Sequence, residues 1–184
     1  AGNNLGATMY YMNRTGGGTQ PAGLAAGGIL IPGGASAKTQ EYDGSSWTES
    51  GNMGTTRRQL TGAGIQTAAL AFGGNEPPIT VATEEYGGSS WTAGGNLSTA
   101  RKIMGMAGTQ TAGLAFGGYS APSRRNETEE YNGTAWSEQN NMSTGRTYLA
   151  GFGIQTAAVA ATVRVTSCSN CKTCNSSSSR SCSS

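Results

Sequence analysis

The chain has 184 residues, enough for one ordinary domain or about four small repeat units, and only 12% of them are charged. Its formal net charge is +2 and it has no basic block, so we expect no nucleic-acid partner. No apolar run approaches the roughly 20 residues that a membrane-spanning helix requires, so we expect no membrane insertion. Histidine is absent, which removes the most common general base and metal ligand, and the chain is predicted not to be an enzyme.

Two short motifs recur along the chain at a nearly constant period of 44 or 45 residues. The motif Glu-Tyr-x-Gly-x-x-Trp occurs three times, and a motif centred on Gln occurs four times. A period in this range indicates an array of supersecondary units that bury their apolar faces against their neighbours. The tryptophans of the first motif are Trp47, Trp91 and Trp136, and the glutamines of the second are Gln20, Gln66, Gln110 and Gln155.

The spacing within each repeat is constant. Trp is followed ten residues later by Arg, at Arg57, Arg101 and Arg146, and each Arg is followed nine residues later by Gln. Constant spacing predicts paired strands, because a slip of one residue would turn every side chain to the other face of the sheet.

In chain order, the expected elements are hairpins and short buried strands. Asp43-Gly44, Gly87-Gly88 and Asn132-Gly133 stand between a Tyr and a Trp and predict two-residue type I′ turns. Residues 67–72 and 111–116 are short, apolar and followed by Gly-Gly, which is typical of a fully buried inner strand.

This order of Arg, an apolar strand ending in Gly-Gly, a variable stretch, Tyr and Trp resembles the Kelch repeat, over roughly residues 2–161. The phrasing is also similar to that of Kelch-like proteins of marine bacteriophages. The resemblance implies four-stranded blades of a β-propeller. The resemblance also makes galactose oxidase, the copper enzyme of Kelch type, an activity to consider. Its copper centre requires histidine ligands, and this chain has no histidine.

The chain ends indicate a further, divided blade. Residues 4–6 resemble residues 96–98, and residues 147–161 resemble the start of a blade, although Ala160-Ala161 stands where Gly-Gly is expected. The predicted fold is therefore an all-β, Kelch-like β-propeller of about four blades, three complete and one split, or an open or oligomer-completed array of blades. The predicted domains are a repeat domain at residues 1–166 and a Cys/Ser-rich tail at residues 167–184.

The repeated side chains have both functional and structural interpretations. Tyr and Trp could stack sugars, or they could pack between adjacent blades. The three Arg side chains could form an anion site around an axis, or they could tie blades together through backbone carbonyls. Neighbouring glutamates, such as Glu84 and Glu85, point to opposite faces of a strand and cannot act together on one bond.

Every difference in repeat length falls between Gly-Gly and Glu-Tyr, at residues 29–40, 75–84 and 119–129. Variation confined to one loop per repeat maps to a single face, which is often the binding face. An unconstrained loop is the alternative interpretation. The candidate ligand-binding residues are Ile31, Glu76, Ile79, Tyr119, Arg124 and Arg125.

All four cysteines lie in the tail, in the pattern Cys-x-x-Cys-x-x-Cys followed by a fourth. Cysteines at this spacing are candidates for disulfides, within the tail or between chains, with free thiols in a flexible tail and a thiolate metal site as the alternatives; no other cofactor is expected. The residues are Cys168, Cys171, Cys174 and Cys182.

The sequence therefore predicts a non-enzymatic binding or structural module, extracellular or on a virion, for instance a tail-fibre attachment component. Its expected partners are a host-surface glycan or protein and other structural subunits, including further copies of itself. The alternative is a secreted structural protein that polymerises by pairing incomplete blades between subunits.

Overall fold

A computed structural model of the chain describes residues 9–10, 18–19 and 21–162. Within these ranges every regular element is a strand, and the paired strands run antiparallel in several small sheets. The prediction of an all-β fold is confirmed. No helix in this part of the chain is long and apolar enough to cross a membrane.

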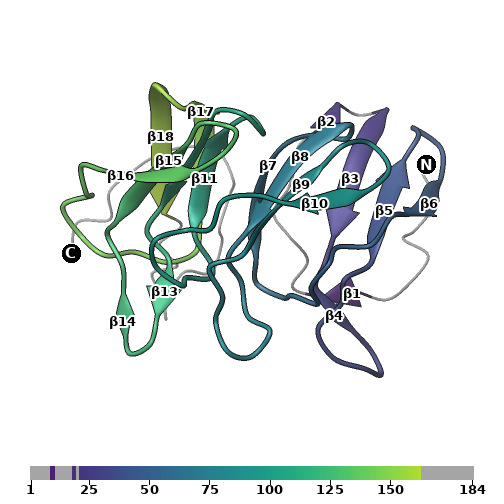
Figure 1. Ribbon diagram of the computed structural model, residues 1–184, viewed down its shortest axis with the longest axis horizontal. Coiled ribbons are helices and arrows are strands. Elements are labelled where there is room, and N and C mark those ends of the chain that lie inside the picture. The colour runs from purple at the N-terminus through teal and green to yellow at the C-terminus, as the bar shows by residue number, and fades with distance from the viewer. Residues whose placement is uncertain (1–8, 11–17, 20, 163–184) are drawn as a thin grey trace, which may run out of the picture.

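Three four-stranded sheets succeed one another along the long axis of the molecule, and we call them units 1, 2 and 3 (Figure 1). Unit 1 contains β2 (Gly18–Thr19), β3 (Ala22–Ala26), β5 (Thr39–Tyr42) and β6 (Trp47–Ser50). Unit 2 contains β7 (Thr61–Ile65), β8 (Ala68–Phe72), β9 (Thr83–Tyr86) and β10 (Trp91–Ala93). Unit 3 contains β11 (Gly105–Gly108), β12 (Gly113–Phe116), β15 (Thr128–Tyr131) and β16 (Trp136–Gln139).

A two-stranded sheet follows unit 3, and we call it the half-unit because it corresponds to the first two strands of a unit. It consists of β17 (Leu149–Ile154) and β18 (Ala157–Thr162). Two further small sheets pair β1 (Met9–Tyr10) with β4 (Ile29–Leu30), and β13 (Tyr119–Ser120) with β14 (Ser123–Arg124).

The residues that precede each unit pair with the loop that follows its second strand. Tyr10 pairs with Ile29 in unit 1, and Lys102 pairs with Tyr119 in unit 3. Arg58 and Asn75 form the corresponding bridge in unit 2. The strand β1 therefore occupies, at unit 1, the place that the residues preceding units 2 and 3 occupy there.

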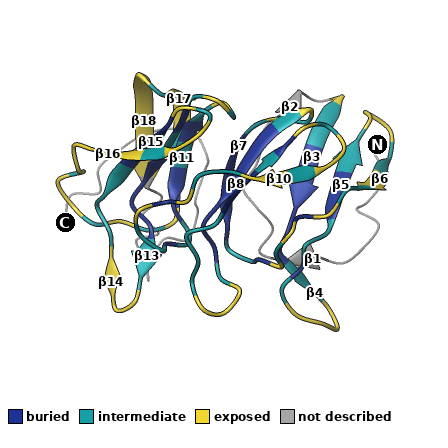
Figure 2. Cartoon of the chain, in the orientation of Figure 1, coloured by how far each residue is buried: buried dark blue, intermediate teal, exposed yellow. Residues whose placement is uncertain are grey.

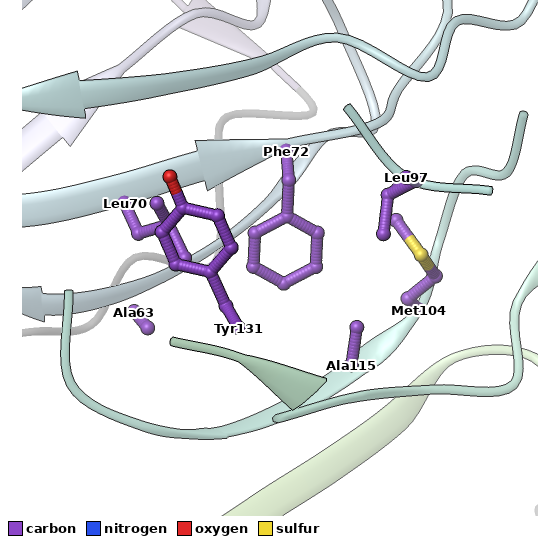
Figure 3. Close-up of a cluster of buried hydrophobic side chains, with 7 residues drawn as sticks. All are labelled: Ala63, Leu70, Phe72, Leu97, Met104, Ala115 and Tyr131. Carbon is purple, nitrogen blue, oxygen red and sulfur yellow. The ribbon is translucent and has the colours of Figure 1, made fainter. Parts of the chain in front are cut away.

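The hydrophobic core lies between the units rather than within one sheet. The largest cluster joins Leu70 and Phe72 of unit 2 to Met104, Ala115 and Tyr131 around unit 3 (Figure 3). Leu70 and Phe72 are completely buried, and burial is concentrated on the inner strands of the successive sheets (Figure 2). Each sheet therefore buries its apolar face against the next one, as the repeat period predicts.

Three of the repeated glutamines, Gln66, Gln110 and Gln155, each connect their own unit to the preceding one. Gln66 lies in the turn between β7 and β8, and its side-chain amide donates to the carbonyls of Gly23 (3.3 Å) and Tyr42 (2.9 Å) in unit 1. Gln110 makes the same two bonds to unit 2, and Gln155 makes them to unit 3. The third member of the series shows that the half-unit is seated on unit 3 like a complete unit.

The repeated Tyr and Trp also bond to the preceding unit. The Tyr86 hydroxyl donates to the Glu41 carboxylate, and the Trp91 Nε1 donates to Thr39 Oγ1 (2.9 Å). In the next interface Tyr131 bonds Glu85 in the same way, and Trp136 bonds Thr83 (2.9 Å). Within each unit the two rings lie against each other, with centroids 5.0 Å apart in units 2 and 3. The packing interpretation of these aromatics therefore describes the structure.

Arg57 and Arg101 are fully buried and form ion pairs with Glu84 and Glu129. Arg57 also donates to the carbonyls of Gly73 (3.1 Å) and Ala82 (2.8 Å), while its own carbonyl accepts from Gly28 of unit 1 (2.8 Å). These arginines hold linkers in place, and neither is available to an external anion. Glu84 and Glu85 indeed face opposite ways, since the first binds Arg57 and the second binds Tyr131.

The prediction of two-residue type I′ turns between Tyr and Trp is wrong. Tyr42 pairs directly with Trp47, so the loop has four residues, and Gly44 has a positive φ of 96° whereas Asp43 does not have a positive φ. The Asp43 carboxylate accepts 2.8 Å bonds from the backbone amides of Ser45 and Ser46, which hold its pKa well below the usual value. A side-chain turn thus replaces the backbone turn, and Asn132 does the same in unit 3.

The position assigned to Ala160 and Ala161 is also corrected. Ala160 pairs with Gly151, as Ala71 pairs with Gly62 in unit 2. Ala161 therefore corresponds to Phe72, and it is Thr162 that stands at the position of the first glycine of the Gly-Gly pair.

The buried ion pairs predict a large and local effect on stability. Replacing Glu129 by Ala leaves Arg101 buried without its counter-charge, so we expect the free energy of unfolding to fall by about 3–5 kcal/mol. The control is Glu49→Ala, since Glu49 pairs with Lys38 at an exposed site, and its cost should not exceed about 1 kcal/mol. Urea unfolding of both variants measures the difference, and equal costs would contradict the structural role of Arg101.

The interface tyrosines predict a pH dependence. Burial, reinforced by the bond to Glu41 or Glu85, raises the pKa of Tyr86 and Tyr131 to about 12 from a usual value of 10. The folded state therefore retains protons that the unfolded state releases, so stability from these groups is complete below pH 10 and is lost between pH 10 and about pH 12. Urea midpoints and tyrosinate absorbance measured across this range test the expectation. Tyr86→Phe and Tyr131→Phe should flatten the decline, and an equally steep decline in both variants would refute it.

Candidate binding surface

Three loops of different length and sequence lie along one edge of the array. They connect β3 to β5, β8 to β9 and β12 to β15, so they leave equivalent strand ends, and Figure 1 shows them together along the lower edge. Each begins at a Gly-Gly pair with positive φ, for example 61° and 105° at Gly73 and Gly74. A Cβ on Gly73 would lie 2.4 Å from the Arg101 carbonyl oxygen, so the glycine permits the linker of the next unit to approach.

The structure places the six candidate residues on this edge, which we call the loop edge, but distributes them over three units. Ile31 of unit 1 is 62% exposed, and Glu76 of unit 2 is also exposed. Tyr119 and Arg124 are register partners in β13 and β14, so these two are neighbours. Ile79 is half-buried and pairs with Asn75, while Arg125 is half-buried and lies 3.3 Å from Glu127.

The loop of unit 3 is anchored to the residues that precede its unit. The amides and carbonyls of Tyr119 and Lys102 exchange two hydrogen bonds of 2.8 and 3.0 Å. The Lys102 ammonium lies 5.8 Å from the centre of the Tyr119 ring and donates to Gln59 Oε1 at 3.0 Å. A cation held against a half-exposed aromatic ring, beside the exposed Arg124, gives this loop a fixed polar and aromatic surface.

The opposite edge varies less. There the turn between the first two strands carries an exposed threonine in unit 2, unit 3 and the half-unit, at Thr67, Thr111 and Thr156, and an exposed Pro21 in unit 1. The side chains of the neighbouring glutamines form the inter-unit hydrogen bonds described above. Differences in loop length thus occur at the loop edge, while three of the four turns at the other edge have Thr at the same position.

A second feature, which the sequence did not predict, is a groove of about 340 Å³ along the inner strands β7, β11 and β17. Its lining includes Gly62, Ala63, Met106, Ala107 and Gly151, and no ionisable side chain contributes to it. Small residues leave the space because they do not fill the gap between the converging strands. The only signal in the sequence is the Gly/Ala content of these strands, which also suits close packing.

The four cysteines of the candidate metal or disulfide site lie outside the described residues. Within the described ranges, no group of three or more acidic or cysteine side chains is arranged to hold a metal ion. No family model matches the chain, and no curated protein matches its sequence.

Proposed function

We propose that this protein is an arc of a Kelch-like β-propeller that acts as a non-enzymatic binding and structural module. The units are its blades, and the loop edge is its ligand-binding face. The observation that carries the proposal is the contrast between the two edges. A repeated scaffold holds three loops of different length and sequence side by side, whereas three of the four turns at the opposite edge present the same residue, Thr.

The chemistry of the loop edge supports recognition rather than catalysis. Its exposed groups are an apolar side chain, a carboxylate and a guanidinium, at Ile31, Glu76 and Arg124, with Tyr119 and Lys102 adding an aromatic ring and a second cation. The chain has no histidine to serve as a general base near them. Such a surface suits a host glycan or protein, bound through an aromatic ring and a few polar groups.

We place the module on the surface of a virion, as a fibre or attachment component, or otherwise outside the cell. The low charge content and the richness in Gly, Ser, Thr and Asn favour that setting, as does the phrasing of the repeats.

Binding of the full chain to a glycan array and to intact host cells tests this proposal. The variant Ile31→Ala/Glu76→Ala/Arg124→Ala removes one exposed side chain from each loop, and we expect it to weaken binding by at least about tenfold. The matched control is Thr67→Ala/Thr111→Ala/Thr156→Ala, which removes one exposed side chain per repeat from the opposite edge. Equal binding by the two variants, with both melting like the unsubstituted chain, would exclude the loop edge as the binding face.

A further inference from the structure

The side of unit 3 that faces the half-unit carries acceptors whose counterparts are occupied at both earlier interfaces. In unit 1, Thr39 and Glu41 accept from Trp91 and Tyr86 of unit 2. In unit 2, Thr83 and Glu85 accept from Trp136 and Tyr131 of unit 3. By register, the corresponding residues of unit 3 are Thr128 and Glu130.

Thr128 and Glu130 lack the Trp and Tyr partners among the described residues, because the described part of the half-unit has two strands. The exposed fraction of the threonine side chain differs accordingly between the units. Thr39 and Thr83 are 0% and 1% exposed beneath their tryptophans, whereas Thr128 is only half-buried.

The half-unit is itself open on the side where a further hairpin would lie. Within the described chain, β18 pairs only with β17, so no described strand covers its other edge. Phe152 and Val159 are each 64% exposed, whereas their counterparts in unit 2, Ala63 and Leu70, are 2% and 0% exposed. Among the described residues, the uncovered edge of β18 thus lies beside two acceptors of unit 3, whereas Phe152 and Val159 lie on the opposite face of the half-unit, which points away from unit 3.

Each hairpin of the repeat's type in the printed sequence is already part of a unit. The three tryptophans stand in the hairpins of units 1, 2 and 3. We propose that this surface, bounded by β18, Thr128 and Glu130, binds one further β-hairpin of the repeat's own type, with Tyr and Trp five residues apart.

The proposed contact continues the interface already present between units. The hairpin would add strands to β18 through backbone hydrogen bonds, its Tyr would donate to Glu130, and its Trp Nε1 would donate to Thr128. A second copy that stacked its intact unit 1 on the half-unit would cover Phe152 and Val159. It would leave the β18 edge and both acceptors unmet, so the observations favour a hairpin. This surface is separate from the loop edge, and its test does not depend on the proposed ligand.

The experiment uses a labelled peptide of residues 83–94, TEEYGGSSWTAG, closed by an amide link because an isolated hairpin is only marginally stable in water. Fluorescence anisotropy with the full, reduced chain should show saturable binding of one peptide per chain. Peptides with Phe in place of Tyr86 or of Trp91 should each bind about 5- to 10-fold more weakly, since each loses one hydrogen bond.

Substitutions in the protein test the same contacts from the other side. Glu130→Ala and Thr128→Val should each weaken binding of the peptide by about 5- to 10-fold. Glu138→Ala, on the outer strand β16 where the carboxylate accepts from Ser98 (3.0 Å), should leave it unchanged. Absence of saturable binding, or equal affinity for the Phe-substituted peptides, would overturn the proposal. It would also be overturned if light scattering showed association of the chain with itself that Trp47→Ala abolished and the peptide did not inhibit.

Discussion

The structure depends on the interface between successive units, where a Tyr hydroxyl on one unit donates to a Glu carboxylate on the unit before it. None of these small sheets encloses a core of its own, since Leu70 and Phe72 are buried by side chains that arrive from unit 3. The Tyr–Glu bond, the Trp–Thr bond and the two Gln bonds fix how one sheet lies on the next. Because every donor and acceptor of this set is partly or fully buried, loss of a neighbouring unit leaves polar groups unpaired as well as apolar surface exposed.

The cost of leaving a buried polar or charged group unpaired also explains why unit 1 differs from units 2 and 3 at the buried ion pair. Glu84 and Glu129 neutralise buried arginines, but the corresponding residue of unit 1 is Gln40, which is 1% exposed. The backbone position that matches Arg57 is Met9, since Tyr10 and Arg58 make equivalent bridges. Where the sequence has no arginine it also has no carboxylate, and this avoids a lone buried charge that would cost several kcal/mol. The arginine and the glutamate that pairs with it are therefore both present at units 2 and 3 and both replaced at unit 1.

The sequence predicted the parts of the structure that repeat. The spacing from Trp to Arg to Gln indicated a fixed strand register, and the recurrence of Tyr and Trp indicated packing between units. It did not predict that Asp43 and Asn132 would form the turn with their side chains, because Asp-Gly and Asn-Gly suit two turn types equally well. The pairing of Glu84 and Glu129 with buried arginines was also not predicted, because these arginines lie 27 and 28 residues earlier in the chain. Only the folded sheet brings each pair together. The groove along β7, β11 and β17 arises from how the sheets converge, which no single strand encodes.

The molecule thus combines a scaffold, whose side chains bond to one another, with loops that differ between units. If the Tyr–Glu bond couples adjacent units, a double-mutant cycle between Glu41 and Tyr86 measures this coupling directly. With Glu41→Gln and Tyr86→Phe, unfolding in urea should give a coupling free energy of about 1–3 kcal/mol. The same cycle between Glu41 and Tyr131, which belong to non-adjacent units, should give none beyond about 0.5 kcal/mol. Additive effects in the first cycle, or equal coupling in both, would contradict the claim.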